Sequence, residues 1–297
     1  MDAWEARVKQ SNIQYADGLR LLRQPVLPLV SMLRFLFLFD PRTSVGEVLD
    51  ELPEPIETAG ALYDRPRELL AGYGGSLARL EAMKQGRYSH VGVVDEENNP
   101  LDPLTADFVL LQQEVLTVEL ERINSLLCGP CGCDLCCTGP DAAMAQEFFE
   151  IPLAPGELES FPMTRHDSPA SRRRRADDED ELRLGGRPFY RLDEPALVHW
   201  QNGWSMILPK GSDCPNLAPG TTRCRIYSGR PEVCRRPQIF PYMVEPFQGS
   251  GEPKAAYRLR RSLLAVTDCP YVSGLQDEIA AYAAACELHL VLKRNKL

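Results

Sequence analysis

The feature that most constrains this chain is a cysteine-rich stretch, SLLCGPCGCDLCCTGP, at residues 125–140. It contains Cys128, Cys131, Cys133, Cys136 and Cys137. Four more cysteines follow in a second block, at Cys214, Cys224, Cys234 and Cys269, and Cys286 is the tenth. Three explanations have to be weighed for so much sulfur: disulfides, a metal site, or a reactive dithiol.

Composition and compartment argue against a disulfide framework. The chain has 297 residues, of which 44% are apolar and 25% charged, so it can form a core without covalent staples. Its first residues lack the basic start and unbroken apolar run of a signal peptide, so we expect a cytoplasmic protein with reduced thiols. A bond between the adjacent Cys136 and Cys137 would also be strained.

The most apolar segment, residues 25–39, is too short for a membrane span and contains Pro28 and Arg34. We therefore expect a buried helix there and no membrane partner. A net charge of −9 disfavours nucleic acid as a partner. The charge-dense insert at 166–187 joins four arginines to a run of acids, and we expect it to be solvated and disordered.

Local patterns predict an α+β fold. We expect a mainly helical N-terminal half, residues 1–127, packed on a small irregular cysteine-cluster module with short strands and a C-terminal helix, residues 128–297. The clearest helix is 103–127, with Asp102 as its cap and Pro103 in its first turn; Pro130, with Gly129, Gly132 and Gly139, stops it. We also expect a short helix at 141–150, strands near 91–94 and 188–209, and a final helix from 273 to the end of the chain.

The cysteine spacing favours a metal site. Cys128 and Cys131 form one CxxC pair, and Cys133 and Cys136 form another. Two intervening residues let both sulfurs of a pair turn toward one ion. A redox dithiol needs only one such pair and does not explain nine clustered cysteines.

The order CxxCC, CPNL, CRIYSGRPEVCR and a late CP resembles the CxxCxxCC cysteine-cluster family, also called YkgJ-like and described as zinc- or iron-chelating. The resemblance covers residues 128–275, interrupted by the charged insert. It implies metal ligands among Cys128, Cys131, Cys133, Cys136, Cys137, Cys214, Cys224, Cys234 and Cys269. The chain departs from the family pattern by one extra cysteine, so either Cys128 or Cys131 is spare. A related module is similar to the cluster-bearing part of a flagellin lysine methylase.

Other residues near the cysteines have expected supporting roles. Arg230 and Arg235 would lie beside the metal ligands and offset the negative charge of the bound thiolates. We expect Tyr227 and Cys286 to be core residues and His199 to be structural. The adjacent cysteines and the arginines favour an iron–sulfur cluster as cofactor, with Zn²⁺ as the alternative.

Two classes of function follow. In the first, the metal or cluster supports redox or modification chemistry on a protein or small molecule. In the second, zinc only stabilises the fold of a protein-interaction module, and the module performs no catalysis. The sequence identifies no catalytic residue, and it leaves open whether the protein is an enzyme.

Overall fold

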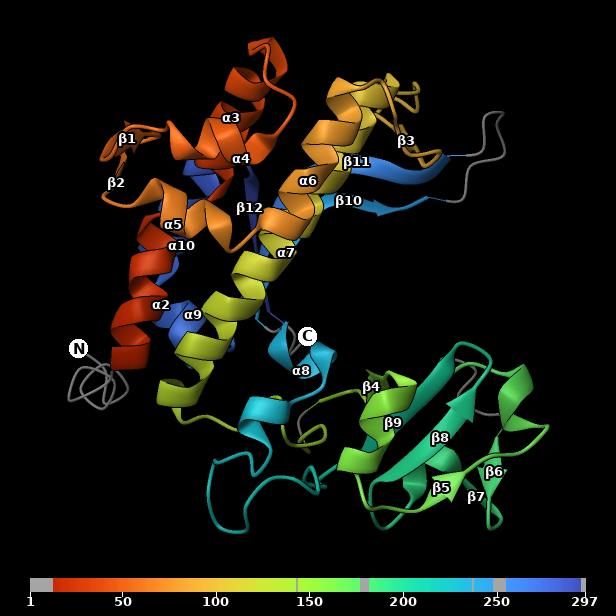
Figure 1. The fold of residues 1–297 in the computed structure, drawn as a ribbon. Helices are drawn as coiled ribbons and strands as arrows, with labels where there is room; N and C mark the ends of the chain where they lie inside the picture. The colour runs from red at the N-terminus through yellow and green to blue at the C-terminus, as the bar shows by residue number, and fades with distance from the viewer. Residues whose placement is uncertain (1–12, 143, 177–181, 237, 248–254, 295–297) are drawn as a thin grey trace. The chain divides into compact units, whose positions relative to one another are not determined.

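The computed structural model describes residues 13–142, 144–176, 182–236, 238–247 and 255–294 (Figure 1). Helices and several small sheets make the fold α+β, as predicted. Contacts between residues divide the chain into two compact units. Unit 1 comprises Met1–Leu127, Gln238–Thr267 and Tyr271–Lys293, and unit 2 comprises Cys128–Pro237, Asp268–Pro270 and Arg294–Leu297.

Helices dominate unit 1. They are α2 (Ile13–Arg23), α3 (Leu27–Phe39), α4 (Val45–Asp50), α5 (Pro66–Ala71), α6 (Gly74–Lys84), most of α7 (Pro103–Cys131), α9 (Pro270–Gly274) and α10 (Gln276–Ala285). The predicted cap of α7 is present, because the Thr105 amide donates to Asp102 Oδ1 at 3.0 Å. Ser44 caps α4 in a similar way, since its Oγ accepts from the Gly46 amide at 3.2 Å.

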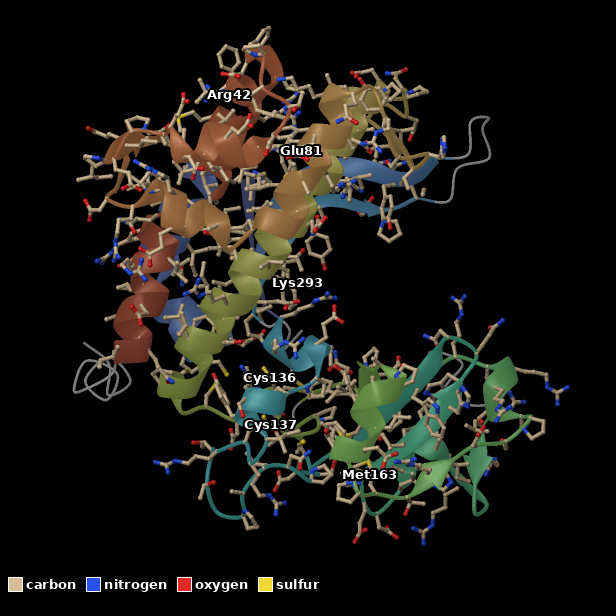
Figure 2. The ribbon with its side chains drawn as sticks, in the orientation of Figure 1. Arg42, Glu81, Cys136, Cys137, Met163 and Lys293 are labelled. Atoms are coloured by element: carbon tan, nitrogen blue, oxygen red, sulfur yellow. The ribbon has the colours of Figure 1, made fainter. Side chains whose placement is uncertain are left out.

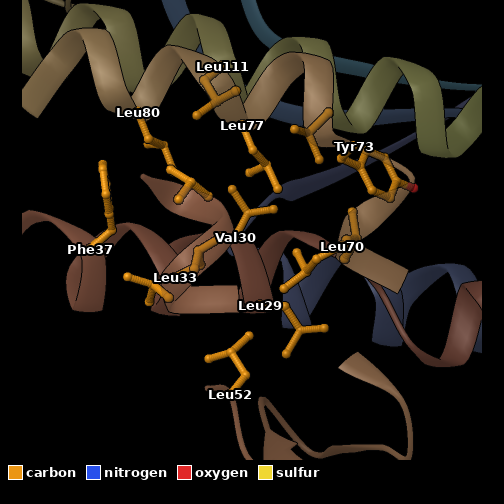
Figure 3. Packing of buried hydrophobic residues seen from close by; sticks show 14 of the residues in the cluster. Leu29, Val30, Leu33, Phe37, Leu52, Leu70, Tyr73, Leu77, Leu80 and Leu111 are labelled. Carbon is orange, nitrogen blue, oxygen red and sulfur yellow. The ribbon is translucent and has the colours of Figure 1, made fainter. Parts of the chain in front are cut away.

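The main apolar core of unit 1 forms where α3 meets its neighbouring helices (Figure 3). Leu29, Val30 and Leu33 of α3 are fully buried and pack with Leu77 and Leu80 of α6. The segment predicted as a buried helix is therefore a helix with one buried face. The opposite face exposes Phe35 and Phe39.

A small mixed sheet completes unit 1. Strand β11 (Ala255–Val266) pairs antiparallel with β10 (Ile239–Pro246) and parallel with both β12 (His289–Lys293) and β3 (Gly92–Val94). A separate hairpin joins β1 (Ile56–Thr58) to β2 (Ala61–Tyr63). Strand β3 lies where the valines of 91–94 predicted a strand.

The predicted C-terminal helix is wrong in its second half. Helix α10 ends at Ala285, Glu287 adopts a φ of +56°, and the chain turns into β12. The alternating side chains of this segment pair in parallel with β11, as at Leu263 and Leu290. Strand pairing with a distant segment thus overrides a helical pattern. Cys286 is buried, as predicted.

A carboxyl group lies fully buried among the helices of unit 1. Glu119 of α7 accepts hydrogen bonds from the Tyr282 hydroxyl at 2.6 Å and from the Val26 amide at 2.8 Å. Burial raises the pKa of Glu119 to about 7, although these two hydrogen bonds and the charge of Arg122 act in the opposite direction. Cys286 lies close enough for the Glu119 charge to contribute to the rise in the pKa of its thiol, which burial dominates.

The larger sheet of unit 2 has the strand order β4 (Phe148–Leu153), β9 (Gly203–Pro209), β8 (Ala196–Trp200) and β5 (Arg165–His166). The hairpin of β8 and β9 closes with Trp200 opposite Gly203, within the segment 188–209 for which strands were predicted. The helix predicted at 141–150 is wrong, because this segment runs into β4 and pairs antiparallel with β9. A second hairpin joins β6 (Arg183–Leu184) to β7 (Arg187–Pro188).

Parts of the charge-dense segment contribute to the core of unit 2. Ala176 and Leu182 are buried in a cluster with Phe189 and Trp200. Arg172 pairs with Asp167, with 2.6 Å between Nε and Oδ1. We predicted disorder for the whole insert at 166–187; of these residues, 177–181 lie outside the described residues.

No single helix in the part of the chain that the structure describes is long and apolar enough to cross a membrane. Helices α2 and α3 meet that length and composition test only as a pair, bent by 47° at the break between them.

Candidate metal centre

Helix α7 carries the first two cysteines in its last turn. We predicted that this helix would end at residue 127, but it continues through Gly129 and Pro130 to Cys131. Gly132, one of the predicted helix breakers, ends it with a φ of +64° that glycine adopts without strain. Because the chain reverses at Gly132, Cys133 can turn back toward Cys131.

Gly129 has a packing role. A Cβ atom at this position would lie 3.1 Å from the hydroxyl of Tyr227. That hydroxyl forms a hydrogen bond with Cys128, and burial, followed by the charge on Cys128, raises the pKa of Tyr227 to about 12. Tyr227 is only half-buried, so its interpretation as a core residue is wrong. Its ring and hydroxyl instead belong to the surroundings of the cysteines.

Three thiols gather after the end of α7. The Sγ atoms of Cys131, Cys133 and Cys269 all lie within 4.8 Å of one another. Cys269 is buried and the other two are half-buried. Cys269 directly precedes α9, whose first residue, Pro270, restricts the backbone next to the thiol. We call these three residues the thiol triad.

The thiols of the triad hydrogen-bond to one another. The bond to Cys131 raises the pKa of Cys133 to about 12. Bonds to Cys131 and Cys133, followed by burial, also raise the pKa of Cys269. Thiols this close together repel when ionised, so they favour the protonated state unless a cation shares them. Such a group is suited to a metal ion.

A second group of cysteines is organised around the loop that follows the triad. We call it the larger cysteine group. Its members are Cys128, Cys136, Cys137, Cys214, Cys224 and Cys234. Figure 2 shows Cys136 and Cys137 in the loop after α7. The Cys214 amide donates to the carbonyl of Cys137 at 2.7 Å, which ties the two loops together.

Backbone pairing also positions the later cysteines. Leu217 and Cys224 form an isolated β-bridge, and the Arg225 amide donates to the Asn216 carbonyl at 2.8 Å. Cys234 lies in the short helix α8 (Glu232–Arg235), whose first amide donates to the Glu157 carboxylate at 2.8 Å. These contacts hold the two downstream cysteines within unit 2.

The thiols of the larger cysteine group influence one another's pKa. Burial raises the pKa of Cys137, and the charges of Cys136, Cys214, Cys224 and Cys128 raise it further. Burial likewise raises the pKa of Cys234 to about 12, with added contributions from Cys214 and Cys224. Among the described residues, however, no three thiols of this group lie within the 4.8 Å that joins the triad.

Arg230 supplies positive charge beside this group. Its side chain is 7% exposed, its Nη1 lies 3.8 Å from Cys128 Sγ, and its guanidinium stacks over Tyr227 at 3.7 Å from the ring centroid. Arg235 donates to the Arg230 carbonyl at 2.7 Å. Arg230 thus contacts a cysteine directly, whereas Arg235 acts on Arg230.

An open cavity lies next to the chain segment that carries Cys214. Its volume is about 650 Å³. Phe161, Pro162, Met163, Thr164, Arg165, Glu194, Pro195, Asp213 and Pro215 line it. Asp213 and Pro215 flank Cys214 in the chain, so the cavity wall includes the backbone neighbours of one predicted ligand. Nothing in the sequence indicated this cavity, because its wall comes from three separate segments.

His199 does not join either cysteine group in the described contacts. Its ring stacks on Trp204 at a centroid distance of 4.6 Å, and its Nδ1 lies 3.2 Å from Asp167 Oδ1. These contacts agree with a structural role.

Comparison with known proteins identifies the cysteine-rich part of the chain. Residues 127–254 match the model of the CxxCxxCC family, which is described as a "putative zinc- or iron-chelating domain". This segment is a CxxCxxCC domain. The resemblance read from the cysteine order is thereby confirmed. Searches of curated proteins and of solved structures found no match.

The CxxCxxCC domain contains every predicted ligand except Cys269, which lies beyond the matched segment. Cys269 nevertheless belongs to unit 2 and meets two cysteines of the domain in the thiol triad. The family description and the triad together support metal binding by this part of the protein.

Proposed function

We propose that the CxxCxxCC domain holds an iron–sulfur cluster on its larger cysteine group, and that this centre supports redox or modification chemistry on a protein or small molecule. The observation that carries the proposal is the position of Cys214. Its amide donates to the Cys137 carbonyl at 2.7 Å, a β-bridge joins nearby Leu217 to Cys224, and its neighbours Asp213 and Pro215 line an open cavity.

The donor set fits such a group. A cluster with four thiolate ligands needs fewer sulfurs than the six that the larger cysteine group offers. Bound thiolates leave net negative charge, which the buried guanidinium of Arg230 can offset beside Cys128. When bound, the cluster would supply one-electron chemistry.

The cavity favours a chemical role over a purely structural one. A structural metal needs only burial and a closed ligand shell. A catalytic metal centre also needs space beside it for a substrate. The volume of about 650 Å³ falls within the range typical of small-molecule sites. Its wall combines apolar Phe161 and Met163 with charged Arg165, Glu194 and Asp213 (Met163 is labelled in Figure 2).

Anaerobic purification with iron, sulfide and zinc analysis tests the proposal. We expect a brown protein with equal amounts of iron and sulfide, and visible absorption that falls on reduction with dithionite. Cys224→Ser and Cys234→Ser should lose both colour and iron, while Cys286→Ala, a cysteine of unit 1, should keep them. A colourless, zinc-loaded protein would instead support the zinc-stapled interaction module.

A further inference from the structure

We infer that the thiol triad of Cys131, Cys133 and Cys269 is a second metal site, separate from the larger cysteine group, that takes a single divalent ion, zinc, through three thiolates. The inference rests on the proposal that unit 2 binds metal through its cysteines. It adds which cysteines act together and what kind of ion they take.

The distances in the triad suit one ion. Zinc–thiolate bonds of about 2.3 Å in a tetrahedral shell place neighbouring sulfurs about 3.8 Å apart. The three Sγ atoms of the triad lie within 4.8 Å of one another, so a small inward movement reaches that spacing. The thiolates of a four-iron cluster each bind a different iron and stand farther apart than thiolates that share one ion.

The backbone holds the triad in this arrangement. Helix α7 ends at Cys131, and the left-handed conformation of Gly132 directs Cys133 back toward it. Cys269 is fixed from the other side of the site by Pro270 at the start of α9. A residue with a Cβ atom at position 132 would be strained at a φ of +64°.

The spacing of the thiols separates the two groups. Cys131, Cys133 and Cys269 lie within 4.8 Å of one another, and among the described residues no thiol of the larger cysteine group meets that limit with all three. The groups approach each other along α7, where Cys128 lies one turn before Cys131.

The triad leaves one position of a tetrahedral ion open. Among the residues that the structure describes, no fourth cysteine, histidine or carboxylate has a ligand atom within 4.8 Å of all three triad sulfurs. Three protein ligands with a fourth place for water or a small ligand are typical of catalytic zinc sites, whereas four protein ligands are typical of structural ones. The triad therefore has the donor number of an exchangeable site.

Differential alkylation of the zinc-supplemented protein tests the inference without any substitution. The protein is treated with iodoacetamide before and after brief exposure to EDTA, and each cysteine is followed by mass spectrometry. We expect protection of all three triad thiols at first. EDTA should then expose them as a set, because the open position admits the chelator, while Cys137, Cys214, Cys224 and Cys234 stay protected.

Cys269→Ser provides the matching substitution, with Cys286→Ala as the control. We expect Cys269→Ser to lose about one zinc per chain and to retain the metal of the larger cysteine group. The inference is overturned if the triad thiols react before EDTA is added, or if both groups become reactive in a single step. A protein that contains no metal at all would refute the proposed function itself, whereas a metal-loaded larger group beside reactive triad thiols would refute only the second site.

Discussion

Glu119 makes the stability of unit 1 depend on pH in a direction opposite to that of most carboxyl groups. The folded state raises the pKa of Glu119 from an ordinary value of 4.5 to about 7, because the group is fully buried. Between these two values the folded state binds more protons than the unfolded state, so stability falls as the pH rises. Below pH 4.5 this contribution is fully present, and above pH 7 it is lost.

The size of the effect follows from the width of that interval. At 1.36 kcal/mol per pH unit, the interval between 4.5 and 7 corresponds to an upper value of about 3 kcal/mol. Glu119→Gln keeps the shape of the side chain and removes the charge. Its carbonyl can accept from the Val26 amide and its amide can donate to the Tyr282 oxygen, in place of the two bonds that the carboxyl accepts.

Urea unfolding at several pH values between 5 and 8.5 measures this contribution as the difference between wild type and Glu119→Gln. We expect the variant to gain stability relative to wild type as the pH rises, by about 2 to 3 kcal/mol over the range. Glu114→Gln, which replaces a half-exposed carboxyl on the same helix, is the control for removing a charge from α7 outside the core. A constant difference between wild type and Glu119→Gln across the range would show that Glu119 does not titrate there, and the reasoning would fail.

Three further substitutions test the packing and the surroundings of the cysteines. Gly139→Ala should destabilise unit 2 by about 1 to 3 kcal/mol in urea unfolding, because its Cβ would lie 2.0 Å from the backbone carbonyl oxygen of Pro209 in β9. The control, Gly156→Ala, should be neutral because its Cβ would meet no atom within 4 Å. Leu33→Ala should lower the free energy of unfolding by about 2 to 5 kcal/mol, because Leu33 is fully buried. Phe39→Ala, on the exposed face of the same helix, should change it by less than about 0.5 kcal/mol. Equal losses in the two variants would contradict the assigned core. Arg235→Ala should leave the urea midpoint of unfolding almost unchanged but shift the absorption or the metal affinity of the centre, because Arg235 donates to the Arg230 carbonyl. If Arg235 is purely structural, the substitution will lower the midpoint and leave the centre unchanged.

Local signals in the sequence predicted the helical parts well. Asp102 and Pro103 marked the start of α7, because capping depends on residues within one turn. The β8–β9 hairpin was predictable for the same reason, since its turn residues adjoin its strands. In each case the interacting residues are neighbours in the chain.

Long-range pairing explains what the sequence did not reveal. Strand β4 replaced a predicted helix because its partner is β9, and β12 replaced the end of the last helix because its partner is β11. The thiol triad likewise joins Cys131 and Cys133 to a cysteine far along the chain. Spacing within one loop could indicate a metal site but could not assign each cysteine to a group.

The most direct test of metal binding by unit 2 is the metal content of the anaerobically purified wild-type protein, measured together with a titration of its thiols under native conditions. We predict about one metal ion per chain or more, and thiols that react fully only after the metal is removed. A metal content near zero, with the thiols titrating fully in the native protein, would contradict it.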